Sequence, residues 1–271
     1  MTLPLWLDDS LRFPNPGTAH PQGLLALGGD LSSERLLAAY GMGIFPWYGE
    51  DDPIMWWCPD PRAVIFPNEF HLSRRLLRRM RRRDYVIRVD SAFAEVIGMC
   101  ANIPRAGEDG TWILPEMMDA YIRLHHEGHA HSVEFWLTPD AAEEIPVDKI
   151  SQLRSAPCAG GYYLAGGCYG VYTGSVFCGE SMFSLARGAS KIALAALSYL
   201  AGRIAARAID CQFMTPHLAS LGAGNISRER YLALLAAPPD NNTYSDWGAA
   251  NTLFADPAWV DEIAGKSPTF L

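Results

Sequence analysis

The hydrophobic and polar positions become regular only after residue 61. From there, short apolar stretches alternate with segments in which apolar residues recur every three or four positions, which is the spacing of an amphipathic helix. The pattern predicts strands at 62–66, 85–89, 131–137, 162–174, 175–180 and 208–213, and helices at 73–83, 91–100, 115–127, 189–206 and 227–236. This mixture has no internal repeat and predicts a mixed α/β (α+β) fold.

The first 61 residues are rich in proline, glycine and tryptophan and carry one short predicted helix. It begins at about Ser33, after the candidate N-cap Ser32, and ends near Gly41 or Gly43. We therefore expect a small N-terminal domain over residues 1–61 and a larger domain over residues 62–271. Residues 138–160 are polar without periodicity, and the segment after Pro238 is expected to be a tail on the surface.

The overall composition is that of a globular protein, with 49% hydrophobic residues among 271 and a formal net charge of −8. The start of the chain has no basic segment followed by an apolar stretch, and the apolar run from Ile192 is interrupted by Arg203. We therefore expect no signal peptide and no membrane span, and a cytoplasmic location. The six cysteines are far apart with no C-x-x-C pair, which favours buried, reduced thiols over disulfides or zinc ligands.

A run of arginines contrasts with this acidic composition. No acidic residue lies between Glu69 and Asp84, and the segment between them contains seven arginines, namely Arg74, Arg75, Arg78, Arg79, Arg81, Arg82 and Arg83. On a helix, the three apolar residues of the run share one side and the guanidinium groups cover the other. Because the planar guanidinium fork suits phosphate oxygens, the run predicts contact with one end of a nucleic acid. The alternative is a solvated face whose charges pair with carboxylates elsewhere.

Two further groups of residues are candidates for binding. Trp47, Trp56, Trp57 and Trp112 lie in loops, where their rings either join the core or offer faces on which an unpaired base stacks. Glu180 lies in the glycine-rich segment 166–191 among apolar neighbours, so it requires a hydrogen-bond donor or a cation, for which Arg187 and Lys191 are alternatives. The glycines of that segment predict bulges or the close approach of another backbone.

Asp210 and Gln212 are two residues apart on a predicted strand, so they should share one face with Cys211 opposite, in the core. A polar pair on a core strand suggests a site. Ser181 lacks the G-x-S-x-G context of a hydrolase nucleophile. The histidines from His125 to His131 do not have H-E-x-x-H spacing, and Gly128 fits better as the end of a helix. We therefore expect no metal and no cofactor.

Several segments can be compared with a known family as a set: "GLLALGGDLSSERLLAAYGMGIFPWY", "PIMWWCPDPRAV", "GTWI", "GHAHSVEFW", "GGCYGV", "FCGESMFS", "IDCQ", "HLASLGA" and "ISRERYL". Together, from about Gly23 to Leu232, they resemble the leucyl/phenylalanyl-tRNA–protein transferase family. The resemblance implies a GNAT-like acyltransferase domain beside the small N-terminal domain. It also implies an enzyme that moves Leu or Phe, and less readily Met, from its tRNA to the N-terminal Arg or Lys of a protein, which marks that protein for N-degron proteolysis.

The resemblance also implies roles for residues noted above. Trp47 and Trp112 match residues around the terminal adenosine of the tRNA. In the matching relay, Gln212 positions the attacking amine while Asp210 polarises it through a hydrogen bond. The remaining matches are the aminoacyl pocket, formed by Cys168, Phe177, Glu180 and Ile209, and the contacts with tRNA phosphates, formed by Arg74, Arg75, Arg78, Arg79 and Arg82. A monomer without membrane contact is expected.

The sequence departs from the family pattern at two places, and two other functions are alternatives to the transferase. Residues 138–160 are longer than the turn usual in the family, and Cys168 stands where a larger apolar residue such as Met is usual, which leaves the preference between Leu and Phe open. A coenzyme A-dependent N-acetyltransferase would need an R/Q-x-x-G-x-G/A loop, whereas Gly188 directly follows Arg187. A tRNA-binding module without catalysis would leave Asp210 and Gln212 without a purpose.

Overall fold

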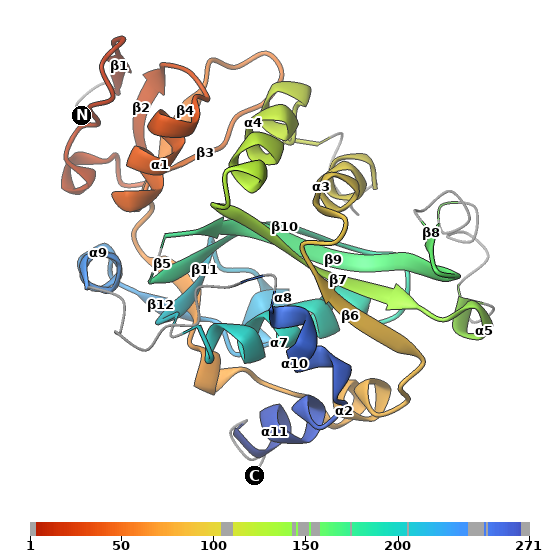
Figure 1. The fold of residues 1–271 in the computed structure, drawn as a ribbon. Coiled ribbons are helices and arrows are strands. Elements are labelled where there is room, and N and C mark those ends of the chain that lie inside the picture. The colour runs from red at the N-terminus through yellow and green to blue at the C-terminus, as the bar shows by residue number, and fades with distance from the viewer. Residues whose placement is uncertain are drawn as a thin grey trace.

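The structure is a computed structural model that describes residues 4–103, 111–142, 145, 152, 158–173, 175–204, 206–237, 247 and 249–266. The first sheet of the chain is small and has the strand order β1-β2-β4-β3 (Figure 1). Its strands are β1 (Leu5–Leu7), β2 (Leu24–Gly28), β3 (Phe45–Pro46) and β4 (Met55–Trp57). Helix α1 (Ser33–Gly41) connects β2 to β3, and a 3-10 turn at Pro16–Thr18 precedes β2.

The second sheet is larger and has the order β12-β5-β11-β10-β9-β7-β6, with β8 paired to β9. All its pairs are antiparallel except β10 with β11, which are parallel. The strands are β5 (Arg62–Ile65), β6 (Tyr85–Val89), β7 (Ala130–Leu137), β8 (Cys158–Ala159), β9 (Tyr162–Tyr172), β10 (Val176–Ser184), β11 (Ala208–Gln212) and β12 (Gly224–Ile226).

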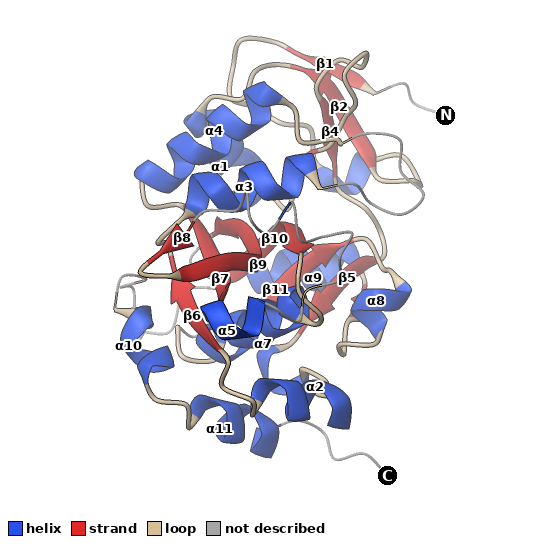
Figure 2. Cartoon of the chain, turned by 90° about the vertical axis from the view of Figure 1, so that its right-hand side faces the viewer, coloured by secondary structure: helices blue, strands red, loops and turns tan. Residues whose placement is uncertain are grey.

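Helices cover both faces of the large sheet (Figure 2). One face is covered by α3 (Phe93–Asn102) and α4 (Pro115–His126), and the other by α7 (Ala189–Ala201) with α2 (Arg74–Met80), α10 (Ala250–Ala255) and α11 (Trp259–Lys266). The shorter helices are α5 (Pro139–Ala142), α8 (Pro216–Ala219) and α9 (Arg228–Ala236), besides a 3-10 turn at Pro67–Glu69. The predicted mixed α/β fold, with a small N-terminal part beside a larger sheet, is confirmed.

Because both faces are covered, strand β7 is buried along its whole length, including its polar positions. Glu134 in its middle has no exposed surface and accepts hydrogen bonds from the Ser91 and Ala92 main-chain N–H groups, the Ser132 hydroxyl and the Trp136 indole. A buried carboxylate needs such donors. The polar residues of this strand therefore serve internal hydrogen bonds and do not form a solvent-facing side.

Local signals predicted some element ends well. Ser32 and Ser227 cap α1 and α9 as expected, since their side chains accept hydrogen bonds from the main-chain N–H groups of Arg35 and Arg230. The predicted helix 73–83 is too long, because the chain turns after Met80 and Arg83 takes a left-handed φ of 56°. The helix predicted at 189–206 ends at Ala201, and the strand predicted at 175–180 continues to Ser184 in pairing with β9.

Two glycines of β9 allow close approach, as predicted, although the neighbours belong to this chain. A Cβ atom at Gly166 would lie 2.5 Å from the Cβ atom of Ala189, where α7 begins against the sheet. A Cβ atom at Gly170 would collide with the carbonyl oxygen of Cys178 on β10. The glycines therefore set how tightly α7 and β10 pack on β9.

The cysteines and the helices bear on two further expectations. Cys58, Cys100, Cys168, Cys178 and Cys211 are free thiols, as predicted, and the predicted burial is confirmed for all of them except Cys211, which is half-buried. The side chain of Cys158 lies outside the described residues. Among the residues that the structure describes, no helix combines the length and the apolar character that a membrane span requires.

The prediction of a surface tail after Pro238 is wrong for the described residues 247 and 249–266. The ring of Trp259 lies 5.4 Å from that of Phe254 and 5.8 Å from that of Tyr199 on α7. The Asn251 side chain accepts a hydrogen bond from the Val89 N–H at 2.9 Å and donates one to its carbonyl at 3.0 Å. Since β6 is an edge strand, α10 covers the edge that the sheet would otherwise expose.

This packing predicts a stability effect in the tail. Trp259 is 4% exposed, so Trp259→Ala should lower the free energy of unfolding by about 3–5 kcal/mol in urea denaturation, because it leaves a cavity. Trp6, which is 68% exposed, is the matched control, and Trp6→Ala should change stability by at most about 0.5 kcal/mol. Equal small effects of both changes would mean that the tail contributes nothing to the fold.

Candidate active site

A cavity of about 380 Å³ opens where the parallel strands β10 and β11 separate, and we call it the strand-gap cavity. The two strands pair from Val176 with Ala208 to Cys178 with Asp210. Beyond that point β10 is irregular between Gly179 and Ser181, and β11 is irregular between Asp210 and Gln212. The main chains of β10 and β11 therefore stop pairing with each other at this point, and residues of both strands line the gap.

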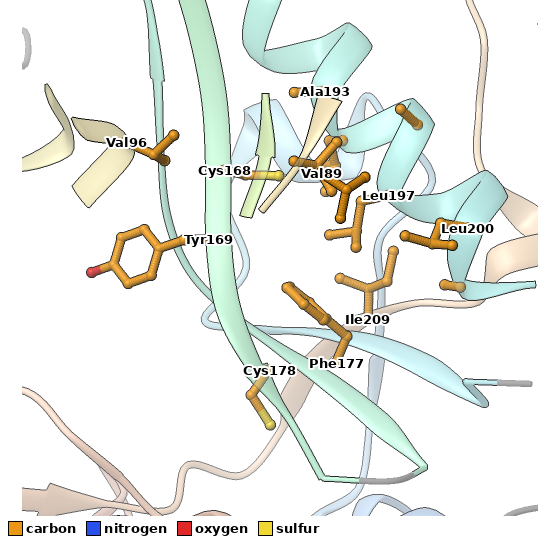
Figure 3. Packing of buried hydrophobic residues seen from close by; sticks show 14 of the residues in the cluster. Val89, Val96, Cys168, Tyr169, Phe177, Cys178, Ala193, Leu197, Leu200 and Ile209 are labelled. Carbon is orange, nitrogen blue, oxygen red and sulfur yellow. The ribbon is translucent and has the colours of Figure 1, made fainter. Parts of the chain in front are cut away.

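The inner part of this cavity is apolar. Figure 3 shows Cys168, Phe177, Leu197 and Ile209 on the same side of β9, with Tyr169 pointing to the opposite side. All four line the cavity, together with Met182, Leu194 and Leu218. Glu180 lines the cavity as well. The structure thus brings together the four residues predicted for one pocket, namely Cys168, Phe177, Glu180 and Ile209.

Asp210 is completely buried and forms an ion pair with Arg62, which is 1% exposed. The Arg62 Nε and Nη2 atoms donate to the two carboxylate oxygens at 2.8 and 2.6 Å, and the Tyr231 hydroxyl donates to Oδ2 at 2.8 Å. The guanidinium lies between the rings of Phe45 and Tyr231, at 4.7 and 4.5 Å from their centroids. Burial opposes the charge of Arg62, but attraction to Asp210 outweighs it, and the net effect raises the arginine pKa.

Gln212 has a left-handed backbone, with φ at 61°. Its main-chain N–H donates to Asp210 Oδ1 at 2.8 Å, while its side-chain Nε2 donates to Glu180 Oε1 at 3.0 Å, across the gap between the strands. Asp210 therefore holds the main chain of Gln212 rather than its amide group. Cys211 packs against the hydrophobic core, as predicted. Because β11 is irregular between Asp210 and Gln212, Cys211 also joins these two residues in lining the cavity.

Glu180 is the second carboxylate of the cavity and is 8% exposed. The Tyr121 hydroxyl donates to its Oε2 atom at 3.1 Å, and the Tyr40 hydroxyl lies 2.5 Å from that of Tyr121. Burial raises the pKa of Glu180 to about 7, although the hydroxyls of Tyr40 and Tyr121 act in the opposite direction. The alternative of an ion pair with Arg187 or Lys191 is not what the structure shows, because those side chains line a different cavity.

An aromatic cluster beside the site consists of Trp47, Trp57 and Phe213. Trp47 is 41% exposed, and its ring lies 5.6 Å from that of Phe213, the residue after Gln212, and 5.5 Å from that of Trp57. Trp56, by contrast, is fully buried and donates its indole N–H to the Gly28 carbonyl, so it is a core residue. Of these three tryptophans, Trp47 therefore offers the most exposed face for stacking.

Trp112 is half-buried and lies just before α4. The Tyr48 hydroxyl donates to the carboxylate of Glu116 in the first turn of α4. This bond joins the segment that carries Trp47 to the segment that carries Trp112. The two tryptophans predicted to act together thus lie on neighbouring parts of the structure.

The arginines line a second cavity of about 590 Å³, which we call the basic hollow. Its cationic lining comes from α2 and the turn after it, and from the start of α7, namely Arg75, Arg78, Arg79, Arg82, Arg187 and Lys191. The sequence predicts Arg187 and Lys191 only as alternative partners of Glu180. Their position on either side of Gly188 in "LARGASK" is the signal that sequence reasoning missed.

The predicted fan of seven exposed arginines needs correction. Arg79 is only half-exposed, forms an ion pair with Asp84 and lies over the rings of Tyr85 and Phe135. Arg82 also pairs with Asp84, at 3.1 Å, and Arg81 pairs with Asp261 at 2.8 Å. The charge-pairing alternative thus holds for three arginines. Arg74 is exposed but does not belong to the residues that line the hollow.

His125 and His131 serve the fold. His131 Nδ1 lies 2.7 Å from Asp90 Oδ2, and its ring stacks on Trp247 at 3.9 Å. His125 Nδ1 lies 2.8 Å from the Ala130 carbonyl oxygen. In the described part of the chain, no group of three or more His, Cys, Asp or Glu side chains is arranged to hold a metal ion.

Four residues of the site were not predicted: Arg62, Tyr231, Tyr40 and Tyr121. Arg62 is separated from Asp210 by 148 positions, and no periodicity connects them. A conspicuous arginine after "PDP" and a tyrosine in "RERYL" were the visible signals. Neither one indicates its partner without the fold.

Comparison with known proteins adds the family context. Residues 64–142 and 152–236 match the family model for leucyl/phenylalanyl-tRNA protein transferase, and residues 29–60 match the model for the N-terminal domain of that family. Two proteins named leucyl/phenylalanyl-tRNA–protein transferase are similar over most of their length. The protein of Anaeromyxobacter sp. is 48% identical over 88% of this chain and 91% of its own, and that of Stutzerimonas stutzeri is 47% identical over 90% and 99%.

A third protein of that name, from Chromobacterium violaceum, is 49% identical over 85% of this chain and 89% of its own. Among solved structures, FemX is similar at 12% identity with a TM-score of 0.39, over 84% of this chain and 65% of that one. So low a score carries no argument about the site.

The buried position of Glu180 predicts a pH-dependent contribution to stability. Its pKa is about 7 in the folded chain and near 4.5 in the unfolded chain, so the folded state holds the proton more tightly and the contribution is lost as pH rises through this window. Between about pH 5 and pH 8, the free energy of unfolding of the wild type should fall by about 2–3 kcal/mol relative to Glu180→Gln. Urea denaturation at both pH values measures this difference, and a constant difference would contradict the burial argument.

Proposed function

Because this chain belongs to the leucyl/phenylalanyl-tRNA–protein transferase family, we propose that it moves Leu or Phe, and less readily Met, from tRNA to the N-terminal Arg or Lys of a protein. Attachment of Leu or Phe would mark that protein for N-degron proteolysis. The observation that carries the proposal is the strand-gap cavity, which joins an apolar end to the polar pair Gln212 and Glu180.

In this reaction the enzyme mainly has to orient the aminoacyl ester and the amine, and it has little need to activate them. An aminoacyl ester is already reactive toward an amine, so the enzyme gains rate by holding the two groups together, without a metal or a covalent intermediate. Cys168, Phe177 and Ile209 surround the Leu or Phe side chain in this proposal, and Gln212 positions the attacking amine. Asp210 holds Gln212 in its left-handed conformation through the main-chain hydrogen bond.

The donor tRNA is proposed to use two further surfaces. Its terminal adenosine stacks at Trp47, with Trp112 on the adjoining segment. The phosphates of its acceptor stem lie in the basic hollow, against Arg75, Arg78, Arg79 and Arg82, with Arg74 beside them. Arg187 and Lys191 extend this surface on α7.

The remaining assignments follow from this function. We place the boundary between the two domains at residue 61, between the last strand of the small sheet and the first strand of the large one, with α10 and α11 in the larger domain. We propose that the enzyme acts as a monomer in the cytoplasm, where aminoacyl-tRNA is found.

Mass spectrometry tests the function directly. The protein is incubated with charged Leu-, Phe- or Met-tRNA and a peptide that starts with Arg, and the peptide should gain the mass of one residue of the donor amino acid. The same peptide with an acetylated N-terminus is the control and should gain nothing. Transfer from acetyl-coenzyme A instead of tRNA would favour the acetyltransferase, and tRNA binding without any product would favour a binding module.

The depth of the apolar end predicts donor specificity. Cys168 lines the cavity and is buried, so Cys168→Met should fill volume and slow transfer of Phe more than transfer of Leu. A methylene-scale change in a hydrophobic pocket contributes roughly 1–3 kcal/mol, so the ratio of the two kcat/KM values should move about tenfold or more. Cys100→Met is the matched control, since Cys100 is buried but does not line the cavity. An unchanged Phe/Leu ratio would place Cys168 outside the pocket.

The basic hollow predicts the salt dependence of tRNA binding. Replacing Arg75, Arg78 and Arg187 by Gln removes three cations of the hollow. Each phosphate contact contributes slightly less than one unit to the slope of log affinity against log salt, so the slope should fall by roughly two to three units. Filter binding of charged tRNA over a salt series measures it, while transfer from an aminoacylated adenosine without the stem should stay near wild type.

The control variant replaces Arg12, Arg81 and Arg83 by Gln, which changes the net charge equally outside the hollow. It should keep the wild-type slope to within about one unit. Equal losses of slope in both variants would show that tRNA senses net charge only, and the hollow would then have no specific role.

A further inference from the structure

We propose that Glu180 is the proton acceptor of the transfer reaction, taking the proton of the attacking amine and returning it to the departing ribose oxygen. The proposal rests on the proposed function and adds a catalytic role to a residue expected only to shape the aminoacyl pocket. Its basis is the set of hydrogen bonds made by Glu180, Asp210 and Gln212, which are among the polar residues that line the strand-gap cavity.

Asp210 is unsuited to accept a proton. Its carboxylate accepts from Arg62 Nε and Nη2, from the Tyr231 hydroxyl and from the Gln212 main chain, and it has no exposed surface. The ion pair with Arg62 stabilises its charge, and a protonated Asp210 would leave a buried guanidinium without its counter-charge. Its role is to position Gln212.

Gln212 is unsuited for a different reason. A side-chain amide has no basic nitrogen, and the Gln212 Nε2 atom already donates to Glu180 at 3.0 Å. Its amide oxygen is an acceptor that orients an amine N–H without taking the proton. Because the two side chains are bonded to each other, an amine held at Gln212 also lies beside Glu180.

Glu180 meets the requirements of a base. Its Oε1 atom accepts a hydrogen bond from Gln212 and its Oε2 atom accepts one from Tyr121, with the Tyr40 hydroxyl also close to the carboxylate. A carboxylate has about four lone-pair sites, so these donors leave a site for a further proton. The ionisable groups that face it are Tyr40 from α1, Tyr121 from α4 and the neutralised pair of Asp210 with Arg62. Burial raises its pKa to about 7, close to the pH at which general bases work best.

The proton balance closes within the site. The neutral amine attacks the ester carbonyl carbon, the C–N bond forms, and a proton passes from nitrogen to a Glu180 oxygen. The bond between the carbonyl carbon and the ribose oxygen then breaks, and that oxygen receives the proton from Glu180. The products are the new amide and the free ribose hydroxyl of the tRNA, and the carboxylate is regenerated without any other reactant.

His217 is the competing candidate, because it also lines the cavity from α8. Burial and the nearby charge of Lys191 lower its pKa, which favours the unprotonated ring that can accept a proton. His217 is exposed, whereas Glu180 is buried and accepts the hydrogen bond from the Gln212 side chain. The closing experiment therefore includes His217→Gln.

The test measures transfer from aminoacylated adenosine to an Arg-starting peptide, as kcat and KM over about pH 5.5–9. Glu180→Gln should lower kcat by roughly 10²–10⁴-fold with donor KM within about threefold of wild type. Below about pH 6.5, log kcat/KM of the wild type should rise with a slope near two, since Glu180 and the peptide amine must both lose a proton. The slope for Glu180→Gln should be near one, and formate should partly restore Glu180→Ala.

Glu134→Gln is the matched control, since Glu134 is equally buried and hydrogen-bonded but lies outside the strand-gap cavity. It should keep the steeper slope even where its melting temperature falls. A Glu180→Gln variant that keeps the steeper slope, or that changes donor KM alone, would overturn the proposal. A slope that falls to near one in His217→Gln would also overturn it. A wild type that transfers nothing to the peptide would instead overturn the proposed function itself.

Discussion

Arg62 and Asp210 form an ion pair from which water is excluded, and the geometry of the whole site depends on it. Neither charge is stable in the interior alone, because removing one partner of such a pair leaves the other uncompensated. The pair joins neighbouring strands, β5 and β11, while the rings of Phe45 and Tyr231 enclose the guanidinium. Since Phe45 belongs to the small sheet and Tyr231 to α9, one buried contact fixes two sheets and a helix against one another.

This constraint also separates the tasks of the polar residues in the gap. The Asp210 carboxylate, engaged by Arg62 and Tyr231, also accepts a hydrogen bond from the main-chain N–H of Gln212, whose backbone has a left-handed conformation. The Gln212 side chain then reaches across the gap to Glu180. The carboxylate paired with Arg62 thus sets the position of Gln212, and Glu180, whose pKa burial raises to about 7, lines the same cavity.

The sequence predicted the features that local signals along the chain or the family resemblance indicate. Ser32 and Ser227 cap the helices that follow them, and the four residues assigned to one pocket do line one cavity. It did not predict what depends on distant partners, such as Arg62 with Asp210, or Asn251 with Val89 at the sheet edge. The strands of the small sheet are two to five residues long, too short for a periodic pattern. Period two did not predict that Asp210, Cys211 and Gln212 would all line one cavity, because an irregularity in β11 interrupts the alternation that the rule assumes.

The basic hollow and the strand-gap cavity are connected through α7. Arg187 and Lys191 at the start of this helix line the basic hollow, and Leu194 and Leu197 farther along it line the strand-gap cavity. A helix rises about 1.5 Å per residue, so only about 9 Å along the axis separates Lys191 from Leu197. Ion pairs of Arg79 and Arg82 with Asp84 hold the opposite wall of the hollow in place. Phosphates bound there would therefore be held by the same rigid helix that shapes the apolar end, so that gripping the nucleic acid fixes where its aminoacyl end is presented.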